Sequence, residues 1–195
     1  YFQREVGWTN VAIALGIKAE PWPDPVPAAI PPGESGTLRI FALAGQSNMS
    51  GFGLAGRIEA PPRVYLFGND YRWYRASEPL DRGYQQVDPV SLDGWGRKRW
   101  TGVGPGIFFA DALVKKMPGP VALVPCARSG SGIEEWLPHR SDATLYGSLL
   151  KRLRAASVEG EPAGLLFFQG EADALQAPGY RFKFRVDDWD RVFVE

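Results

Sequence analysis

Three short polar clusters hold the residues of this chain that could do chemistry. They are residues 45–49 (GQSNM), 127–136 (ARSGSGIEEW) and 169–173 (QGEAD), and each directly follows an apolar run. A serine at a strand-to-helix turn exposes its hydroxyl beside backbone N–H groups, which suits acyl transfer through a nucleophile and oxyanion donors. Glycines in the second cluster leave a backbone N–H unobstructed, and a glutamine side chain adds a further donor. Ordinary polar turns are the alternative for any one cluster, but three at successive strand ends favour a site.

The apolar runs and amphipathic segments predict the elements that must position these clusters. Short continuous apolar runs predict buried parallel strands at 38–44, 63–67, 121–125 and 164–168. Helical spacing predicts helices at 105–117, 146–156 and 180–192, although 192–194 could instead open another strand. Strands that alternate with helices predict an α/β fold with a parallel sheet. The carboxyl ends of its strands would bring the three clusters to one edge.

Composition excludes several classes of protein. The 195 residues suit one domain, and 22 Lys+Arg against 22 Asp+Glu exclude nucleic-acid binding through bulk positive charge. One cysteine, Cys126, excludes an internal disulfide and multi-cysteine metal sites, and we interpret it as a small buried residue. One histidine, His139, excludes multi-histidine metal sites and leaves a single imidazole for acid–base work. The early apolar stretch at 11–17 is too short to span a membrane.

The chain divides into three parts. Residues 1–3 (YFQ) look like the remnant of a cleaved purification tag. Residues 4–37 form an N-terminal extension, in which six prolines between 21 and 33 predict an extended connector. Residues 38–195 form the α/β domain.

Four segments carry a resemblance to a known family: AGQSNM (44–49), GPGIFFADAL (104–113), SGSGIEEW (129–136) and QGEAD (169–173). Residues 63–80, with Trp73 and Glu78-Pro79-Leu80, share this resemblance. Across roughly 38–190 the chain resembles the SGNH/GDSL hydrolase superfamily, specifically the sialate O-acetylesterase-like branch that includes carbohydrate esterase family 6. The resemblance implies a flavodoxin-like, three-layer α/β/α fold. It also implies a serine esterase that removes acetyl groups from carbohydrates, with an acetylated saccharide as its partner and without a metal or organic cofactor.

The resemblance assigns roles to single residues. Ser47 matches the nucleophile, and its own N–H, Gly130 and Gln169 match the oxyanion donors. Four further motif positions are expected to support the site: Gln46, Asn48, Glu171 and Asp173. Trp73 and Trp136 are candidates for contact with a sugar ring. For Trp73, packing beneath a loop is the alternative.

The sequence departs from the family in one respect. The family places its catalytic base in a C-terminal Asp-x-x-His motif, which is absent here, and we expect His139 in a surface loop rather than in its place. We therefore expect the domain to be C-terminally incomplete, a piece of an active esterase. A variant that lost catalysis is the alternative, and it would serve as a carbohydrate-binding module. An O-acyltransferase is a third reading of the same site.

Two other patterns are interpreted as structural. Residues 51–56 spell G-x-G-x-x-G, but they do not directly follow a strand and open a helix, as a dinucleotide fingerprint must. Glu134 and Glu135 are neighbours in sequence, whereas a glycosidase pair must flank one bond.

Overall fold

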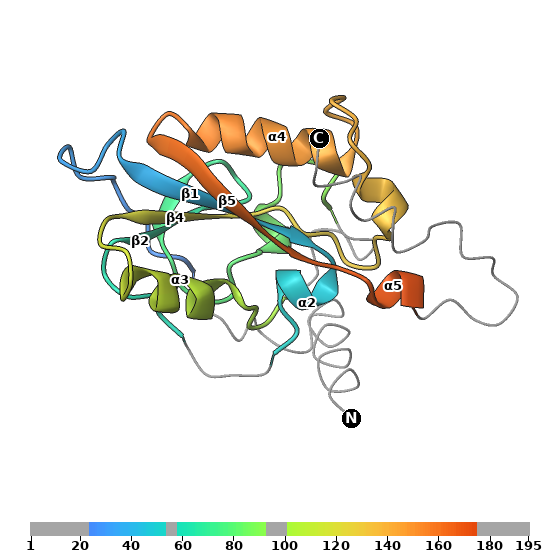
Figure 1. Cartoon of the computed structure of the whole chain (residues 1–195), viewed down its shortest axis with the longest axis horizontal. Helices are drawn as coiled ribbons and strands as arrows, with labels where there is room; N and C mark the ends of the chain where they lie inside the picture. Colours follow the sequence, from blue (N-terminus) through green and yellow to red (C-terminus); the bar gives the residue numbers. More distant parts are fainter. Residues whose placement is uncertain (1–23, 54–57, 93–100, 175–195) are drawn as a thin grey trace, which may run out of the picture.

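The computed structural model describes residues 24–53, 58–92 and 101–174, and these form an α/β fold around one five-stranded sheet (Figure 1). The strand order is β3-β2-β4-β1-β5. Four strands run parallel, and only β3 runs antiparallel to its neighbour β2. The strands are β1 (Leu38–Gly45), β2 (Val64–Phe67), β3 (Trp73–Arg75), β4 (Val121–Pro125) and β5 (Gly160–Phe168). The expectations for 1–3, 11–17 and 180–192 lie outside the described residues.

Helices lie on both faces of the sheet, so the fold has the three layers that the resemblance implied. Figure 1 shows α4 on one side of the sheet and α2 and α3 on the other. The helices are α2 (Ser47–Ser50), α3 (Gly106–Val114), α4 (Leu145–Ala156) and α5 (Glu171–Ala174), with 3₁₀ turns η1 (Gly83–Gln85) and η3 (Ile133–Trp136). None of the helices in the described ranges is long and apolar enough to cross a bilayer.

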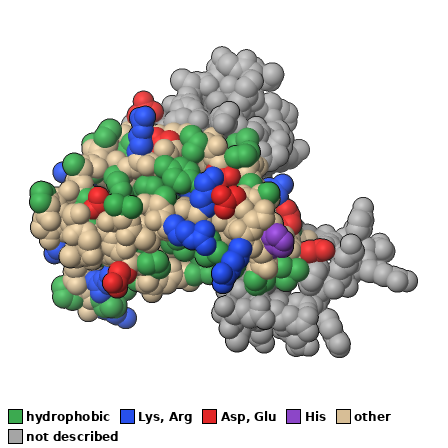
Figure 2. All heavy atoms as spheres, turned by 90° about the horizontal axis from the view of Figure 1, so that it is seen from above, with side chains coloured by type: hydrophobic (Ala, Val, Ile, Leu, Met, Phe, Trp, Pro, Cys, Tyr) green, Lys and Arg blue, Asp and Glu red, His purple; other side chains and the backbone are tan. Residues whose placement is uncertain are grey.

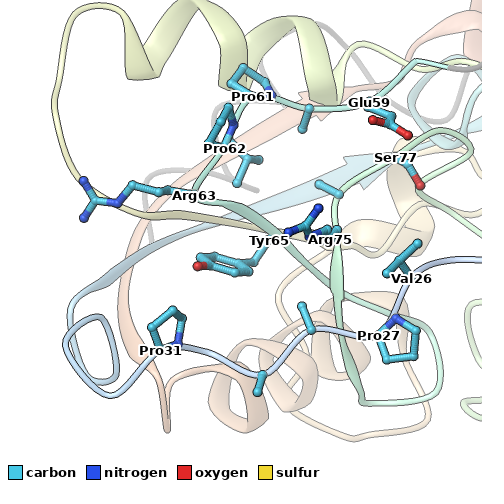
Figure 3. Close-up of a pocket in the computed structure, with 15 residues that line it drawn as sticks. Val26, Pro27, Pro31, Glu59, Pro61, Pro62, Arg63, Tyr65, Arg75 and Ser77 are labelled. Atoms are coloured by element: carbon cyan, nitrogen blue, oxygen red, sulfur yellow. The ribbon is translucent and has the colours of Figure 1, made fainter.

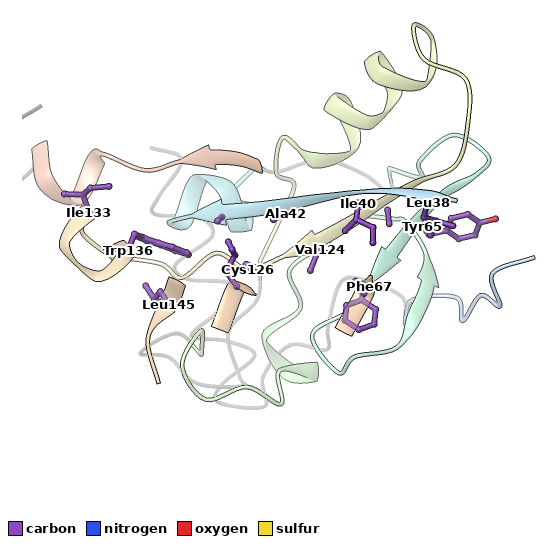
Figure 4. Close-up of a cluster of buried hydrophobic side chains, with 14 residues drawn as sticks. Leu38, Ile40, Ala42, Tyr65, Phe67, Val124, Cys126, Ile133, Trp136 and Leu145 are labelled. Carbon is purple, nitrogen blue, oxygen red and sulfur yellow. The ribbon is translucent and has the colours of Figure 1, made fainter. Parts of the chain in front are cut away.

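Alternate residues of the central strands fill two separate cores. On β1, Ile40 and Ala42 belong to the cluster that includes Leu149 of α4, drawn in part in Figure 4. Phe41 and Leu43 belong to the opposite cluster, which includes residues of α3. Burial on both faces is why these strands read as continuous apolar runs rather than as alternating patterns.

The observed elements match most predicted ones and correct others. The strand predicted at 164–168 begins earlier, because Gly160 already pairs with Leu38 of β1. The prediction that it is buried is wrong, because β5 is an edge strand of the described sheet and most of its residues are exposed. The predicted helix 146–156 begins at Leu145, after the Thr144 hydroxyl oxygen accepts the Gly147 N–H at 3.0 Å. The sequence did not predict β3. The proline-rich connector is extended where it is described, and Pro27 forms a bridge with Tyr74 of β3.

Candidate active site

The three polar clusters meet at the carboxyl edge of the sheet, because β4, β1 and β5 are direct neighbours. The Gln46 N–H donates to the Phe168 carbonyl at 3.0 Å, and the Arg128 N–H donates to the Gly45 carbonyl at 2.9 Å. These two bonds link the loop after β1 to the ends of both neighbouring strands. The prediction that the clusters share one edge is confirmed.

Gly45 ends β1 at a point where its backbone lies directly against that of β5. Its φ is +128°, and a Cβ at this position would lie 2.1 Å from the Phe168 carbonyl oxygen. Only glycine satisfies both conditions without moving a strand. The chain can therefore turn directly from β1 into α2, whose first residue is Ser47.

Ser47 is half-buried and stands beside unpaired backbone donors. The Gln46 carbonyl accepts the N–H groups of Met49 and Ser50 at 2.9 and 3.0 Å. Within the described ranges, the N–H groups of Ser47 and of the exposed Gly130 have no hydrogen-bond partner. The Ser50 and Ser129 hydroxyls lie 3.4 Å apart, which brings α2 against the loop that carries Gly130. Free N–H groups of this kind can stabilise a developing oxyanion.

Gln169 is the first residue of the third cluster, and its amide is already hydrogen-bonded. Its Nε2 donates to the Ser131 carbonyl at 3.0 Å and also to the Asp173 carboxylate. The side chain is only 6% exposed, and no hydrogen bond joins it to Ser47 among the described residues. The Gln169 amide, which was expected to donate to an oxyanion, therefore donates to the second loop and to α5 in this structure.

Asp173 and Glu171 attach the short helix α5 to the other two loops. The Asp173 carboxylate accepts the Ile133 N–H at 3.1 and 3.3 Å to its two oxygens. The Glu171 carboxylate accepts a hydrogen bond from the Asn48 side chain. The Gln46 Oε1 accepts the Ala172 N–H at 3.1 Å. All four residues expected to support the site thus make hydrogen bonds between its loops.

Sequence reasoning missed Ser131. Its hydroxyl donates to the Arg128 carbonyl at 2.8 Å and accepts the Trp136 Nε1–H at 3.0 Å. The hydroxyl therefore ties the start of the second loop to η3. A small polar residue in a glycine-rich loop gave no sign of this role.

A family model described as carbohydrate esterase, sialic acid-specific acetylesterase, matches residues 37–186. That range contains all five strands and all three loops. The chain belongs to this family of carbohydrate esterases.

The chain is also similar to single curated or solved proteins. The chain is 31% identical to the probable carbohydrate esterase At4g34215 of Arabidopsis thaliana over 170 residues, covering 77% of this chain and 58% of the plant protein. The crystal structure of that protein superposes with a TM-score of 0.53 and 30% identity, over 72% of this chain and 60% of the other. A crystal structure of NanS superposes with a TM-score of 0.44 and 21% identity, over 74% and 57%. The chain thus spans about three fifths of the plant protein's length.

The two tryptophans suggested for sugar contact lie in different surroundings. Trp136 is 2% exposed and packs edge-on against Phe167, with ring centroids 5.5 Å apart. The ring is therefore part of the core beneath the second loop and cannot stack on a sugar. The prediction of sugar contact for Trp136 is wrong. Trp73 packs on Phe67 at 4.9 Å in β3, three strands from β1. At the usual strand spacing that is about 14 Å from the strand that leads to Ser47.

His139 is exposed in the loop after η3, as expected, and is the purple side chain in Figure 2. Its Nδ1 accepts the Ser141 N–H at 3.3 Å, and its carbonyl accepts the Thr144 hydroxyl at 2.7 Å. Both contacts are local to the loop that precedes α4.

Cys126 directly follows β4 but is not a second nucleophile. Burial raises the pKa of its thiol to about 12, so the reactive thiolate is absent near neutral pH. In the described part of the chain, no three carboxylate, thiol or imidazole side chains gather as the ligands of a metal ion would.

A cavity of about 680 Å³ lies away from Ser47, at the amino edge of β2 (Figure 3). Its walls come from the connector and from the loop before β2, including Pro27, Pro31 and Pro62. Glu34 ties these walls together, because it accepts the Tyr65 hydroxyl at 2.7 Å and pairs with Arg63 at 2.5 Å. The hydrogen bond from Tyr65 lowers the pKa of the Glu34 carboxyl. This cavity has no strand-end loop and none of the predicted site residues.

Proposed function

We propose that this protein is a serine esterase that removes O-acetyl groups from carbohydrates through an acetyl-enzyme on Ser47. The observation that carries the proposal is the junction of three strand-end loops around α2. Ser47 begins this helix, and its N–H and that of Gly130 are unpaired within the described ranges. Membership in a family of sialic acid-specific acetylesterases supports the class of reaction.

The proposed reaction has two halves. The Ser47 Oγ attacks the acetyl carbonyl carbon, and the tetrahedral oxyanion accepts hydrogen bonds from the N–H groups of Ser47 and Gly130. The C–O bond to the sugar then breaks, and the sugar oxygen takes up the proton that Ser47 gave to a base. Water then attacks the carbonyl carbon of the acetyl-enzyme and gives a proton to the base. The bond between Ser47 Oγ and the acetyl group breaks as the base passes that proton to Ser47, and acetate leaves.

Gln169 enters the proposal in two ways. As a third oxyanion donor it would have to release one of its bonds to Ser131 or Asp173. As a structural residue it keeps both bonds, and these hold the third loop in its position beside α2. A direct donor role predicts that Gln169→Ala lowers kcat roughly 10²–10³-fold. A role in holding the loops predicts a loss of stability as well.

The proposed reaction needs a catalytic base, and we assign that role to none of the described residues. The resemblance assigns it to an Asp-x-x-His motif, and His139 makes only local contacts. Activity is therefore best measured on the whole protein, translated from its complete reading frame. In a 195-residue form we expect almost no turnover and no effect of His139→Ala. Substantial turnover that His139→Ala removes would make that histidine the base.

The test uses an O-acetylated sialic acid and a small aryl acetate as substrates. Ser47→Ala should abolish acetate release from both, because the nucleophile is gone. Ser157→Ala is the matched control, since within the described residues the Ser157 hydroxyl donates to the Leu153 carbonyl at the end of α4 and makes no contact with the site. Full activity of Ser47→Ala would refute the mechanism, and release from the aryl ester alone would refute the carbohydrate substrate.

A further inference from the structure

Glu78 is a buried carboxyl group that the proposed reaction does not use. It is 1% exposed and lies in the segment between β3 and η1. One carboxylate oxygen accepts the Leu80 N–H at 2.9 Å, and the other accepts the Gly104 N–H at 3.4 Å. Its own N–H donates to the Ile58 carbonyl at 2.9 Å. One side chain therefore joins two segments that lie 26 residues apart.

Gly104 in turn lies against the turn that follows Ser47. A Cβ on Gly104 would be 2.9 Å from the Met49 carbonyl oxygen, so the two backbones are in direct contact. The Gly102 N–H donates to the Gly51 carbonyl at 2.8 Å, and the Gly51 N–H donates to the Ser47 carbonyl at 2.9 Å. A continuous series of backbone contacts thus runs from the Glu78 carboxylate to Ser47.

We infer that Glu78 is a positioning residue whose carboxylate holds the 102–104 segment against α2 and so fixes the backbone around Ser47. Two backbone N–H groups that point at one buried side chain need a charged acceptor more than a neutral one. The consequence for catalysis rests on the function proposed above, but the contact itself does not.

The ionisation of Glu78 should control this contact. Burial raises the pKa of Glu78 to about 7, and the hydrogen bonds from Leu80 and Gly104 oppose that rise. The charged neighbours are Arg82, which lowers the pKa, and Asp81, which raises it. A protonated carboxyl turns one oxygen into a donor, and the longer bond to Gly104 is the one to weaken. The Ser47 turn is therefore held best above pH 7.

The first test measures the contact between Glu78 and the 102–104 segment in a protein that lacks the proposed nucleophile. In the Ser47→Ala protein, the amide proton resonances of Leu80 and Gly104 should titrate with a midpoint near pH 7. Hydrogen-exchange protection of residues 47–53, taken relative to that of β1, should rise through the same pH range, since the local contact strengthens while the fold as a whole loses stability. Glu78→Gln should abolish both changes, whereas Glu59→Gln, an exposed glutamate in the neighbouring loop, should preserve them. Amide resonances that stay flat in the Ser47→Ala protein would overturn the inference without any need for a Glu78 variant.

The second test reads catalysis in the whole protein. At about pH 8, Glu78→Gln should lower kcat for an aryl acetate roughly 10- to 100-fold and leave KM within about twofold, since the loss is one of alignment. The difference in kcat between the wild-type protein and Glu78→Gln should become smaller as the pH falls below 7, because the Glu78 carboxyl is then neutral as well. Equal kcat values for Glu78→Gln and Glu59→Gln at pH 8 would overturn the inference. If the amides titrate but Ser47→Ala keeps full activity, the proposed function fails and the contact stands.

Discussion

The Asp173 carboxylate holds two loops of the candidate site at once. It accepts the Ile133 N–H of the second loop and an N–H of Gln169 in the third. An asparagine at this position would replace one carboxylate oxygen with an NH₂ group, which would face the N–H donors of Ile133 and Gln169. A hydrogen bond to a charged group contributes about 1.5–3 kcal/mol, and a buried donor left unpaired costs a similar amount.

We expect Asp173→Asn to lower the free energy of unfolding by about 1–3 kcal/mol and to lower kcat in the whole protein. Urea unfolding and steady-state kinetics measure the two effects. Asp111→Asn is the control, since Asp111 pairs with Lys115 on the surface of α3 and such pairs contribute little. Equal unfolding free energies and kcat values for the two variants would contradict the account.

For single residues, the sequence predicted which side chains lie together at the site but not which hydrogen bonds they make. The apolar runs before Ser47, Gly130 and Gln169 were enough to place all three at one edge. The direction of the Gln169 amide depends on Ser131 and Asp173, which are 38 and 4 residues away, and no local pattern records it. Glu78 was noticed only as part of the resemblance over residues 63–80. Its buried position was not predicted, because a glutamate in a loop usually faces solvent.

At the scale of elements, the site depends on how closely β1 and β5 approach at their carboxyl ends. Gly45→Ala would place a methyl group 2.1 Å from the Phe168 carbonyl and would strain a backbone with φ of +128°. We expect a loss of about 2–4 kcal/mol in the free energy of unfolding, together with displacement of α2.

Gly33→Ala is the matched control for Gly45→Ala. A Cβ at Gly33 meets nothing within 4 Å, and its backbone is not in the left-handed region. We expect a change within about 0.5 kcal/mol. Denaturant titrations of both variants make the comparison. A Gly45→Ala protein as stable as Gly33→Ala would mean that the strand ends are not held as closely as described.

The long apolar runs were the most predictable elements, and the short ones the least. β1 and β4 are buried on both faces, so their residues are almost all apolar. β3 has three residues and shows no periodic pattern of its own. It exists because Trp73 and Tyr74 pair with β2 and because the connector adds to its other edge. Tertiary pairing of this kind is absent from any local window of sequence.

At the scale of the whole molecule, Glu78 makes the stability of the fold depend on pH. Its pKa is about 7 in the folded protein, against 4.5 for the unperturbed group. The folded state therefore binds the proton more tightly than the unfolded state. The resulting contribution to the free energy of unfolding is fully present below pH 4.5 and is lost as the pH rises through 7. At 1.36 kcal/mol per pKa unit, the loss is about 3 kcal/mol.

Glu78→Gln should remove this dependence, since the amide cannot ionise. Relative to that variant, the wild-type protein should lose about 3 kcal/mol of unfolding free energy between about pH 4.5 and 8. Urea unfolding of both proteins across this range gives the difference directly. A difference that stays constant with pH would show that Glu78 keeps an ordinary pKa in the fold.

The central claim is that Ser47 carries the acetyl group during turnover. The direct measurement mixes the whole protein with an acetylated sugar or aryl acetate, quenches it with acid during the first turnovers, and maps the acetyl group by peptide mass spectrometry. We expect one acetyl group on the peptide that contains Ser47, and neither acetyl-enzyme nor acetate release in Ser47→Ala. Acetate release by Ser47→Ala at the wild-type rate, or an acetyl group on another residue that turns over as fast as acetate appears, would contradict it.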